Sequence, residues 1–127
     1  MNIFGIGTDI VNIDRIKNSL KNKNFINRIF NKKEIQKCKK IYNSNNCYAK
    51  RFAAKEAFSK ALGTGISKGI NFNEIVILNK KTGSPYISII GKTKQTLNKK
   101  FKRKKPKISL SLSDEKKYAV AFVTISI

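Results

Sequence analysis

The sequence predicts a fold that combines helices with strands paired as hairpins, and three observations support this. Two pairs of strand-like segments, 74–78 with 86–90 and 108–113 with 118–125, are each separated by turn-forming residues. A further alternating segment, Asn2 to Thr8, predicts a strand at the start of the chain. Residues 47–62 carry the 3.6-residue periodicity of one long helix. The length of 127 residues suits one hydrophobic core, so we expect one domain over 1–127.

The first forty residues are expected to form a strand and two helices. The first strand should end at Asp9, where the chain turns into a helix over Val11–Leu20. Asn31 is followed three residues later by Glu34, a spacing typical of a capping box. It predicts a second helix that begins at Asn31 and runs to about residue 40.

The predicted long helix places one carboxylate between a close-packing face and several cations. Alanines at 49, 53, 57 and 61 form a stripe of small residues along it. Phe52, Glu56 and Lys60 share the adjoining face, so Glu56 should lie beside buried surface. Gly63 suits the left-handed position that ends many helices, and residues 64–65 extend it into a loop whose N–H groups can face an anion. An ordinary amphipathic helix with a Glu56–Lys60 pair is the alternative.

The second half of the chain should consist of two hairpins joined by a short helix. Breaker residues fill Asn79–Pro85, which predicts the turn of the first hairpin. Lys92–Phe101 has weak helical character, and Arg103–Lys107 reads as a solvated basic loop. The second hairpin should turn around residues 114–117.

The charge balance suggests a second class of function. The chain has 28 Lys and Arg against 7 Asp and Glu, a net charge of +21, which is typical of nucleic-acid binders. Lys outnumbers Arg 24 to 4, however, and Lys, Asn and Ile together make up 57 residues, so the bias indicates compositional drift. A basic nucleic-acid-binding protein remains the alternative, although stacking aromatic residues interleaved with Arg are absent.

The residue types that the chain lacks limit the catalytic groups and the metals that it can use. The chain has no His, which excludes Ser-His and Cys-His catalysis and leaves only hard, oxygen-ligated metals such as Mg²⁺. No apolar run reaches the roughly 18 residues that span a bilayer, and the first residues lack the basic region of a signal peptide. We therefore expect a cytoplasmic protein without membrane contact. In that reducing compartment Cys38 and Cys47 should be packing residues or free thiols instead of a disulfide.

Two of the few acids form a candidate metal pair. Asp9 ends the first predicted strand, and Glu56 lies on the long helix beside apolar residues. Mg²⁺ commonly takes one or two protein carboxylates together with substrate phosphate oxygens and water, so this pair is sufficient. The alternative for Asp9 is a helix cap for the segment that begins near Val11.

Four segments together resemble a known family. They are Gly5–Val11 followed by Arg15-Ile16, Arg51–Gly65, Gly83–Tyr86, and Ser111–Ser113 leading into Tyr118–Ala121. With them the chain resembles the holo-[acyl-carrier-protein] synthases, the small bacterial 4′-phosphopantetheinyl transferases, over essentially its whole length. The resemblance implies an α+β fold, with a small antiparallel sheet wrapped by helices, and a homotrimer with active sites between subunits.

The resemblance also implies the reaction. The family transfers 4′-phosphopantetheine from coenzyme A to a serine of apo acyl carrier protein, for fatty acid biosynthesis, and releases adenosine 3′,5′-bisphosphate. Mg²⁺ would be the cofactor and coenzyme A the co-substrate, with no role for nucleic acid.

The matching positions suggest a role for each site residue. Asp9 and Glu56 match the family's metal ligands, and Lys60 matches a lysine close to the coenzyme A phosphates, so Glu56 and Lys60 are the catalytic candidates. Arg15 matches an arginine that engages the acidic carrier protein. The segments that contact coenzyme A in the family contain Arg51, Gly63, Thr64, Gly65, Ser84 and Pro85.

Two positions depart from the family pattern. Asp114 stands where many members have His beside the coenzyme A phosphates, so the carboxylate should point away, serve as a turn residue or act on the metal side. We favour an outer-sphere role near Mg²⁺. Ser84 replaces a lysine and removes one possible phosphate cation, although Lys80 and Lys81 are close in sequence.

Overall fold

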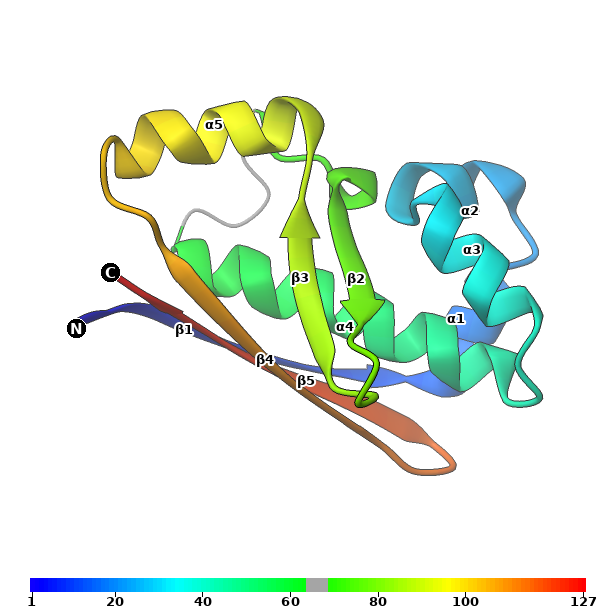
Figure 1. The fold of residues 1–127 in the computed structure, drawn as a ribbon. Coiled ribbons are helices and arrows are strands. Elements are labelled where there is room, and N and C mark those ends of the chain that lie inside the picture. Colours follow the sequence, from blue (N-terminus) through cyan, green and yellow to red (C-terminus); the bar gives the residue numbers. More distant parts are fainter. Residues whose placement is uncertain (64–68) are drawn as a thin grey trace.

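One long central helix, with strands on two of its sides, organises the chain in the computed structural model, which describes residues 1–63 and 69–127 (Figure 1). The elements in chain order are β1 (Ile3–Asn12), α1 (Ile13–Ser19), α2 (Lys23–Ile29), α3 (Lys32–Lys39), α4 (Ser44–Leu62), the 3₁₀ turn η1 (Phe72–Glu74), β2 (Ile75–Asn79), β3 (Pro85–Ile89), α5 (Gly91–Phe101), β4 (Lys107–Asp114) and β5 (Tyr118–Ser126). The expected α+β class is confirmed, with antiparallel sheets and helices in one fold.

Two separate antiparallel sheets flank α4. The larger sheet has the order β1-β5-β4, and the smaller is the β2–β3 hairpin. In the larger sheet Asp9 lies opposite Ala121, which in turn lies opposite Leu112. The two chain ends are adjacent (Figure 1), because Asn2 and Ile127 exchange two backbone hydrogen bonds of 2.8 Å. Among the described residues no helix is both long and apolar enough to cross a bilayer.

The packing of β1 on α4 confirms the predicted stripe of alanines. The four alanines of the stripe are at most 2% exposed. Strand β1 lies so close to this face that a Cβ built on Gly5 would meet the Ala61 carbonyl oxygen at 1.8 Å, and one on Gly7 would meet that of Ala57 at 1.8 Å. Only glycine permits this approach, so these residues fix the distance between β1 and α4.

A buried ion pair joins α4 to α3 and to the second sheet. The Lys55 and Glu34 side chains are both 0% exposed, and the ammonium lies 2.7 Å from the carboxylate. Lys55 also donates to the carbonyl oxygens of Phe72 and Ile75, at 2.7 and 2.8 Å. Glu34 accepts from the backbone N–H of Asn31, which completes the predicted capping box. All three ammonium protons are used, as a buried charge requires.

The structure corrects the predicted start of the chain. Strand β1 continues through Asp9 to Asn12, because its pairing with β5 extends to Asn12 opposite Tyr118. Helix α1 therefore begins at Ile13, and its cap is Asn12, which accepts from the N–H of Arg15 at 3.1 Å. Asp9 is thus not a helix cap. The sequence analysis also missed α2, a seven-residue helix capped by Asn22.

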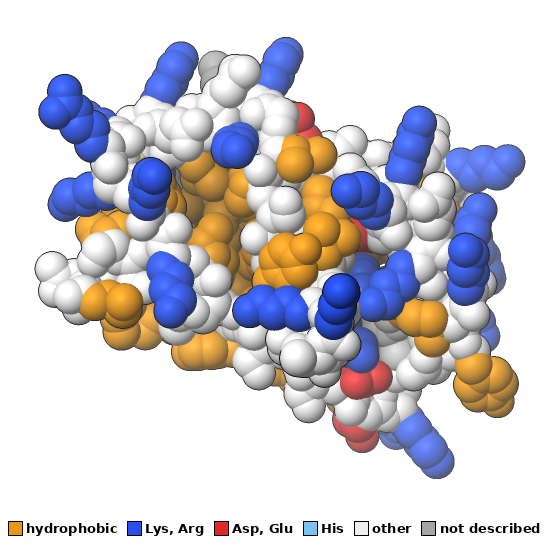
Figure 2. Space-filling model, in the orientation of Figure 1, with side chains coloured by type: hydrophobic (Ala, Val, Ile, Leu, Met, Phe, Trp, Pro, Cys, Tyr) orange, Lys and Arg blue, Asp and Glu red, His pale blue; other side chains and the backbone are white. Residues whose placement is uncertain are grey.

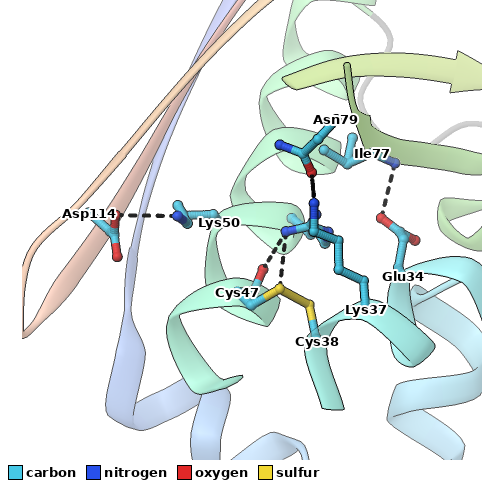
Figure 3. The surroundings of a disulfide bond; sticks show 9 residues. Glu34, Lys37, Cys38, Cys47, Lys50, Ile77, Asn79 and Asp114 are labelled. Atoms are coloured by element: carbon cyan, nitrogen blue, oxygen red, sulfur yellow. Dashed lines mark hydrogen bonds and ion pairs between the residues drawn. A yellow bond between two sulfur atoms is a disulfide. The ribbon is translucent and has the colours of Figure 1, made fainter. Parts of the chain in front are cut away.

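The expectation of free thiols is wrong. Cys38 at the end of α3 and Cys47 in the first turns of α4 form a disulfide (Figure 3). The expectation rested on the compartment, whereas the packing of α3 on α4 decides the outcome by bringing the two Cα atoms to 5.5 Å. Both side chains are buried.

The outer face of the larger sheet is apolar and exposed. Side chains alternate along its strands, so Asp9, Ala119 and Ala121 face α4 while their neighbours face away. The outward set on β1 and β5 includes Ile6 (55% exposed), Ile10 (63%), Val120 (36%) and Phe122 (44%). A contiguous apolar face of this kind is typical of an association surface.

Candidate functional site

Three predicted site residues meet where β1 crosses α4. The Asp9 carboxylate projects from β1 toward the helix and is 15% exposed. The Lys60 ammonium donates to an Asp9 carboxylate oxygen at 3.1 Å and to the Thr8 carbonyl oxygen at 2.9 Å. No ion pair within 4.0 Å joins Glu56 to Lys60 among the described residues. The alternative of an isolated Glu56–Lys60 pair is therefore replaced by a contact between the helix and the strand.

Glu56 lies close to both groups and is half-buried. Burial raises the pKa of its carboxyl above the ordinary value, the charge of Asp9 raises it further, and Lys60 acts in the opposite direction. Two repelling carboxylates with one shared lysine are a donor set that a hard cation such as Mg²⁺ fits. No cluster of three or more His, Cys, Asp and Glu side chains able to hold a metal occurs in the described ranges, so a cation held by this pair would need further ligands such as phosphate oxygens and water.

A mainly apolar pocket of about 670 Å³ opens beside Glu56. Phe25 and Ile29 of α2 form one wall, and Phe52 of α4 with Phe72 of η1 form others. The sequence analysis did not find this pocket because it missed α2. The spacing of Phe25 and Ile29, four residues apart and hence on one helical face, is a signal in the sequence that could have revealed it. Polar contributions come from Arg28, Asn71, Asn73 and Glu74.

The end of α4 agrees with the predicted glycine turn. Gly63 has the left-handed value φ +79° and donates its N–H to the Lys60 carbonyl oxygen at 3.0 Å. Thr64 and Gly65 lie outside the described residues. Lys60 and Gly63 therefore belong to the same end of the helix, next to Asp9.

Arg51 lies elsewhere on α4, with the turn of the first hairpin. It is five residues from Glu56, which places the two side chains about 140° apart around the helix axis. The guanidinium is 4% exposed and donates to the Asn79 side-chain oxygen at 2.9 Å. Ser84 is exposed in that turn, and Pro85 begins β3 opposite Asn79. Within one chain the predicted site residues thus form two groups, the Asp9 group (Asp9, Glu56, Lys60 and Gly63) and the Arg51 group (Arg51, Ser84 and Pro85).

Further cations surround the Arg51 group. The pKa of Lys37 is lowered by burial and by the charges of Arg51 and Lys50, so these three cations are close together. Figure 2 shows that most other Lys and Arg side chains project from all parts of the visible face, around hydrophobic surface. The three cations at Arg51 lie close enough to act on one anionic group together.

Asp114 belongs to this second region. Its carboxylate lies 3.4 Å from the Lys50 ammonium and accepts from the Asn46 amide at 2.7 Å. Asp9 is two strands away across the sheet, in register with Leu112 of β4. This geometry does not support the outer-sphere role that we favoured and instead pairs Asp114 with a lysine.

Arg15 is exposed on α1, which follows β1 directly. Its backbone N–H is held by Asn12. The side chain is therefore displayed three residues beyond the strand that carries Asp9, on a face open to a partner.

Comparisons with known proteins agree with this arrangement. A family model of the 4′-phosphopantetheinyl transferase superfamily matches residues 5–123. A holo-[acyl-carrier-protein] synthase of Pelagibacter ubique is 51% identical over 125 residues, which cover 98% of each chain. The crystal structure of holo-[acyl-carrier-protein] synthase from Neisseria meningitidis has a TM-score of 0.87 at 38% identity, covering 98% of this chain and 99% of that one. The Helicobacter pylori holo-[acyl-carrier-protein] synthase in complex with coenzyme A has a TM-score of 0.79 at 33% identity, covering 95% and 99%.

The matched region contains every described residue of the Asp9 and Arg51 groups. Sequence and fold therefore agree, and the chain belongs to the 4′-phosphopantetheinyl transferase superfamily, among the holo-[acyl-carrier-protein] synthases.

Proposed function

We propose that this chain transfers 4′-phosphopantetheine from coenzyme A to a serine of apo acyl carrier protein, as one catalytic domain over residues 1–127. The observation that carries the proposal is the meeting of Asp9, Glu56 and Lys60 beside an apolar pocket. Support also comes from relatives named holo-[acyl-carrier-protein] synthase and from a similar structure in complex with coenzyme A. The products are holo acyl carrier protein and adenosine 3′,5′-bisphosphate.

The reaction exchanges one phosphorus–oxygen bond for another. The serine oxygen bonds to the β-phosphorus, the bond from that phosphorus to the adenosine-bearing phosphate oxygen breaks, and the serine proton is released. Glu56 accepts this proton directly or through one water, in keeping with its place beside Asp9 and Lys60. Lys60 is placed to offset negative charge on the departing phosphate. Positioning and charge neutralisation supply most of the catalysis in such transfers.

Asp9 and Glu56 are the residues that would hold Mg²⁺. When bound there, the ion would neutralise phosphate charge that Lys60 cannot balance alone. The chain's own contribution is to fix both carboxylates on rigid elements, β1 and α4, whose separation is set by the glycines of β1.

The proposal includes a homotrimer with active sites between subunits. Its support is the exposed apolar face of the larger sheet, together with the separation of the Asp9 and Arg51 groups within one chain. A neighbouring subunit would cover that face and complete each site with a second group; the number three comes from the family resemblance. Light scattering should give three times the monomer mass, and Ile10→Glu should reduce it.

Coenzyme A is proposed to bind with its reacting phosphates at the Asp9 group and its remaining phosphate near the Arg51 group of a neighbouring subunit, where Lys37, Lys50 and Arg51 concentrate positive charge. The carrier protein would meet the exposed Arg15 of α1, and the net charge of +21 would speed its association. A cytoplasmic location is part of the proposal and is tested by fractionation of cells that express the chain.

Intact-mass spectrometry tests the activity directly. Apo acyl carrier protein incubated with the chain, coenzyme A and Mg²⁺ should gain the mass of phosphopantetheine, and chelation of Mg²⁺ should prevent the gain. Asp9→Asn and Glu56→Gln should each slow the transfer about a hundredfold or more while the fold is retained. Asp14→Asn is the matched control, because it removes one negative charge from an exposed position on α1.

Two results would contradict the proposal. One is near-normal transfer by Asp9→Asn or Glu56→Gln. The other is the absence of any mass gain together with tight nucleic-acid binding at physiological salt, which would favour the basic nucleic-acid-binding alternative.

A further inference from the structure

Asn79, the last residue of β2, connects two helices to the turn of the first hairpin. Its side-chain oxygen accepts from the Arg51 guanidinium of α4 at 2.9 Å and from the Lys37 ammonium of α3. Its side-chain N–H₂ donates to the Gly83 carbonyl oxygen at 2.9 Å. One amide group therefore uses both its acceptor and its donor side to hold three parts of the chain together.

The helical side of this contact is firmly fixed. Arg51 is buried, and a second guanidinium nitrogen donates to the Cys47 carbonyl oxygen at 3.3 Å and to the Cys47 sulfur at 3.2 Å. The Cys38–Cys47 disulfide joins the helices that supply Lys37 and Arg51, and Figure 3 shows Asn79 close above this bridge. The position of the Asn79 oxygen is thus determined by rigid neighbours.

The turn is short and exposed. Within residues 80–84 the Lys80 N–H donates to the Ser84 carbonyl oxygen at 2.9 Å, and the Gly83 N–H donates to the Lys80 carbonyl oxygen at 2.8 Å. The β2–β3 ladder, which ends at Asn79 opposite Pro85, holds the two ends of the turn. The bond from Asn79 to Gly83 holds the tip of the turn.

We propose that Asn79 is a positioning residue for coenzyme A, which it serves by holding the Ser84–Pro85 turn against the Arg51 group. It acts through the turn and does not itself touch the reacting atoms. Arg51, in the same way, serves the turn through Asn79, since its buried guanidinium is already engaged there. This inference rests on the proposed function, because the turn matters only if coenzyme A binds beside it.

The substitution Asn79→Asp keeps the hydrogen-bond acceptor of the side chain and removes its donor. A carboxylate still accepts from Arg51 and Lys37, and more strongly than an amide, so the buried guanidinium keeps its partner and the melting temperature should not fall. The carboxylate cannot donate to the Gly83 carbonyl oxygen, so the turn is released. The Michaelis constant for coenzyme A should rise about fivefold, the equivalent of one lost hydrogen bond of about 1 kcal/mol. The kcat and the Michaelis constant for the carrier protein should each stay within about twofold of their wild-type values.

A matched control accounts for the added charge. Thr82→Asp places the same charge on the exposed tip of the same turn, where the only side-chain hydrogen bond among the described residues is to Ser84. It leaves the Asn79–Gly83 bond intact, so its effect on the coenzyme A constant should be clearly smaller. Amide hydrogen exchange provides a readout independent of activity, because the amides of residues 80–84 should exchange faster in Asn79→Asp and remain unchanged in α4.

The outcomes are distinct. Equal increases of the coenzyme A constant in both variants would show a charge effect and overturn the inference, as would unchanged exchange in the turn or a melting temperature that falls in step with activity. If the wild-type chain neither transfers phosphopantetheine nor binds coenzyme A in calorimetry, the proposed function fails and the coenzyme A role of Asn79 fails with it. If transfer is normal and Asn79→Asp behaves as wild type, only the role of Asn79 is refuted.

Discussion

The close approach of β1 to α4 makes Gly7→Ala a sharp test of how the Asp9 group is built. The added Cβ would lie 1.8 Å from the Ala57 carbonyl oxygen and 2.8 Å from the Ala61 backbone nitrogen. Real Cβ atoms essentially never come within 3.0 Å of such neighbours, so β1 must move from α4 by at least 1.2 Å. Asp9 is two residues further along β1, and Glu56 is on α4, so the same movement separates the two carboxylates.

The structure gives the size of the effect. Both contacts are to backbone atoms, which cannot rotate away, so the cost should lie at the upper end of the range for overpacking, about 3 kcal/mol. A displacement of about 1 Å at a site that works by positioning can lower the rate about a hundredfold. Gly7→Ala should therefore lose both stability and transfer, and the remaining folded protein should be nearly inactive.

Chemical denaturation and the intact-mass assay, run below the unfolding transition, measure the two losses separately. Gly63→Ala is the control for stability, since its Cβ meets nothing within 4 Å among the residues that the structure describes, and the left-handed conformation opposes it by about 1 kcal/mol. Adding Ala57→Gly to Gly7→Ala should not restore either property, because the clash is with the backbone oxygen. Restoration by Ala57→Gly, or wild-type transfer by Gly7→Ala, would refute this account of the site.

Three further predictions concern the carrier interface, the disulfide and the buried lysine. Arg15→Ala should raise the Michaelis constant for the carrier protein and reduce its salt dependence, and Arg103→Ala is the control at another exposed arginine. A change in the Michaelis constant for coenzyme A alone would place Arg15 in the cofactor site. The double substitution Cys38→Ala and Cys47→Ala should lower the free energy of unfolding by about 2–3 kcal/mol, because the disulfide closes a loop of about ten residues. Equal denaturation midpoints for this variant and the oxidised wild type would contradict the prediction. Burial lowers the pKa of Lys55 from 10.5 to about 8, although the charge of Glu34 opposes this shift. Between pH 8 and pH 10.5 the unfolded state therefore binds the Lys55 proton more tightly than the folded state does. The contribution of Lys55 to the free energy of unfolding then rises with pH, by at most about 1.4 kcal/mol per pH unit. The free energy of unfolding of wild type relative to Lys55→Met should thus increase from pH 8 to pH 9.5, and a constant difference would oppose the assignment.

The sequence by itself determined those features that depend on local chemistry. The capping box of Asn31 and Glu34 specified the start of α3, and Gly63 specified the end of α4, because both depend on backbone groups within one turn. Alternation and breaker residues located both hairpins, since a strand's two faces are visible in a period of two. The alanine stripe predicted a close approach to α4 correctly.

The candidate site was predictable only in part. The sequence singled out Asp9 and Glu56 because acids are rare in this chain, and Lys60 because it shares a helical face with Glu56 and matches a lysine of the family. The structure brings the three together. The sequence did not show that Lys60 would contact Asp9 across two elements, nor that Asn79 would be the partner of Arg51. Side-chain direction on a helix depends on which neighbours pack against it, and those neighbours are distant in sequence.

Only the tertiary structure decided where β1 ends and that Cys38 and Cys47 form a disulfide. β1 extends to Asn12 because β5, more than a hundred residues later, continues to pair with it. Cys38 and Cys47 are joined because α3 packs on α4, a fact that a rule about compartments does not contain. The α2 helix is too short to be stable from local interactions, and its apolar side is buried only when the chain closes around the pocket beside Glu56. Such features follow from long-range contacts, whose free energy exists only once the whole chain has folded.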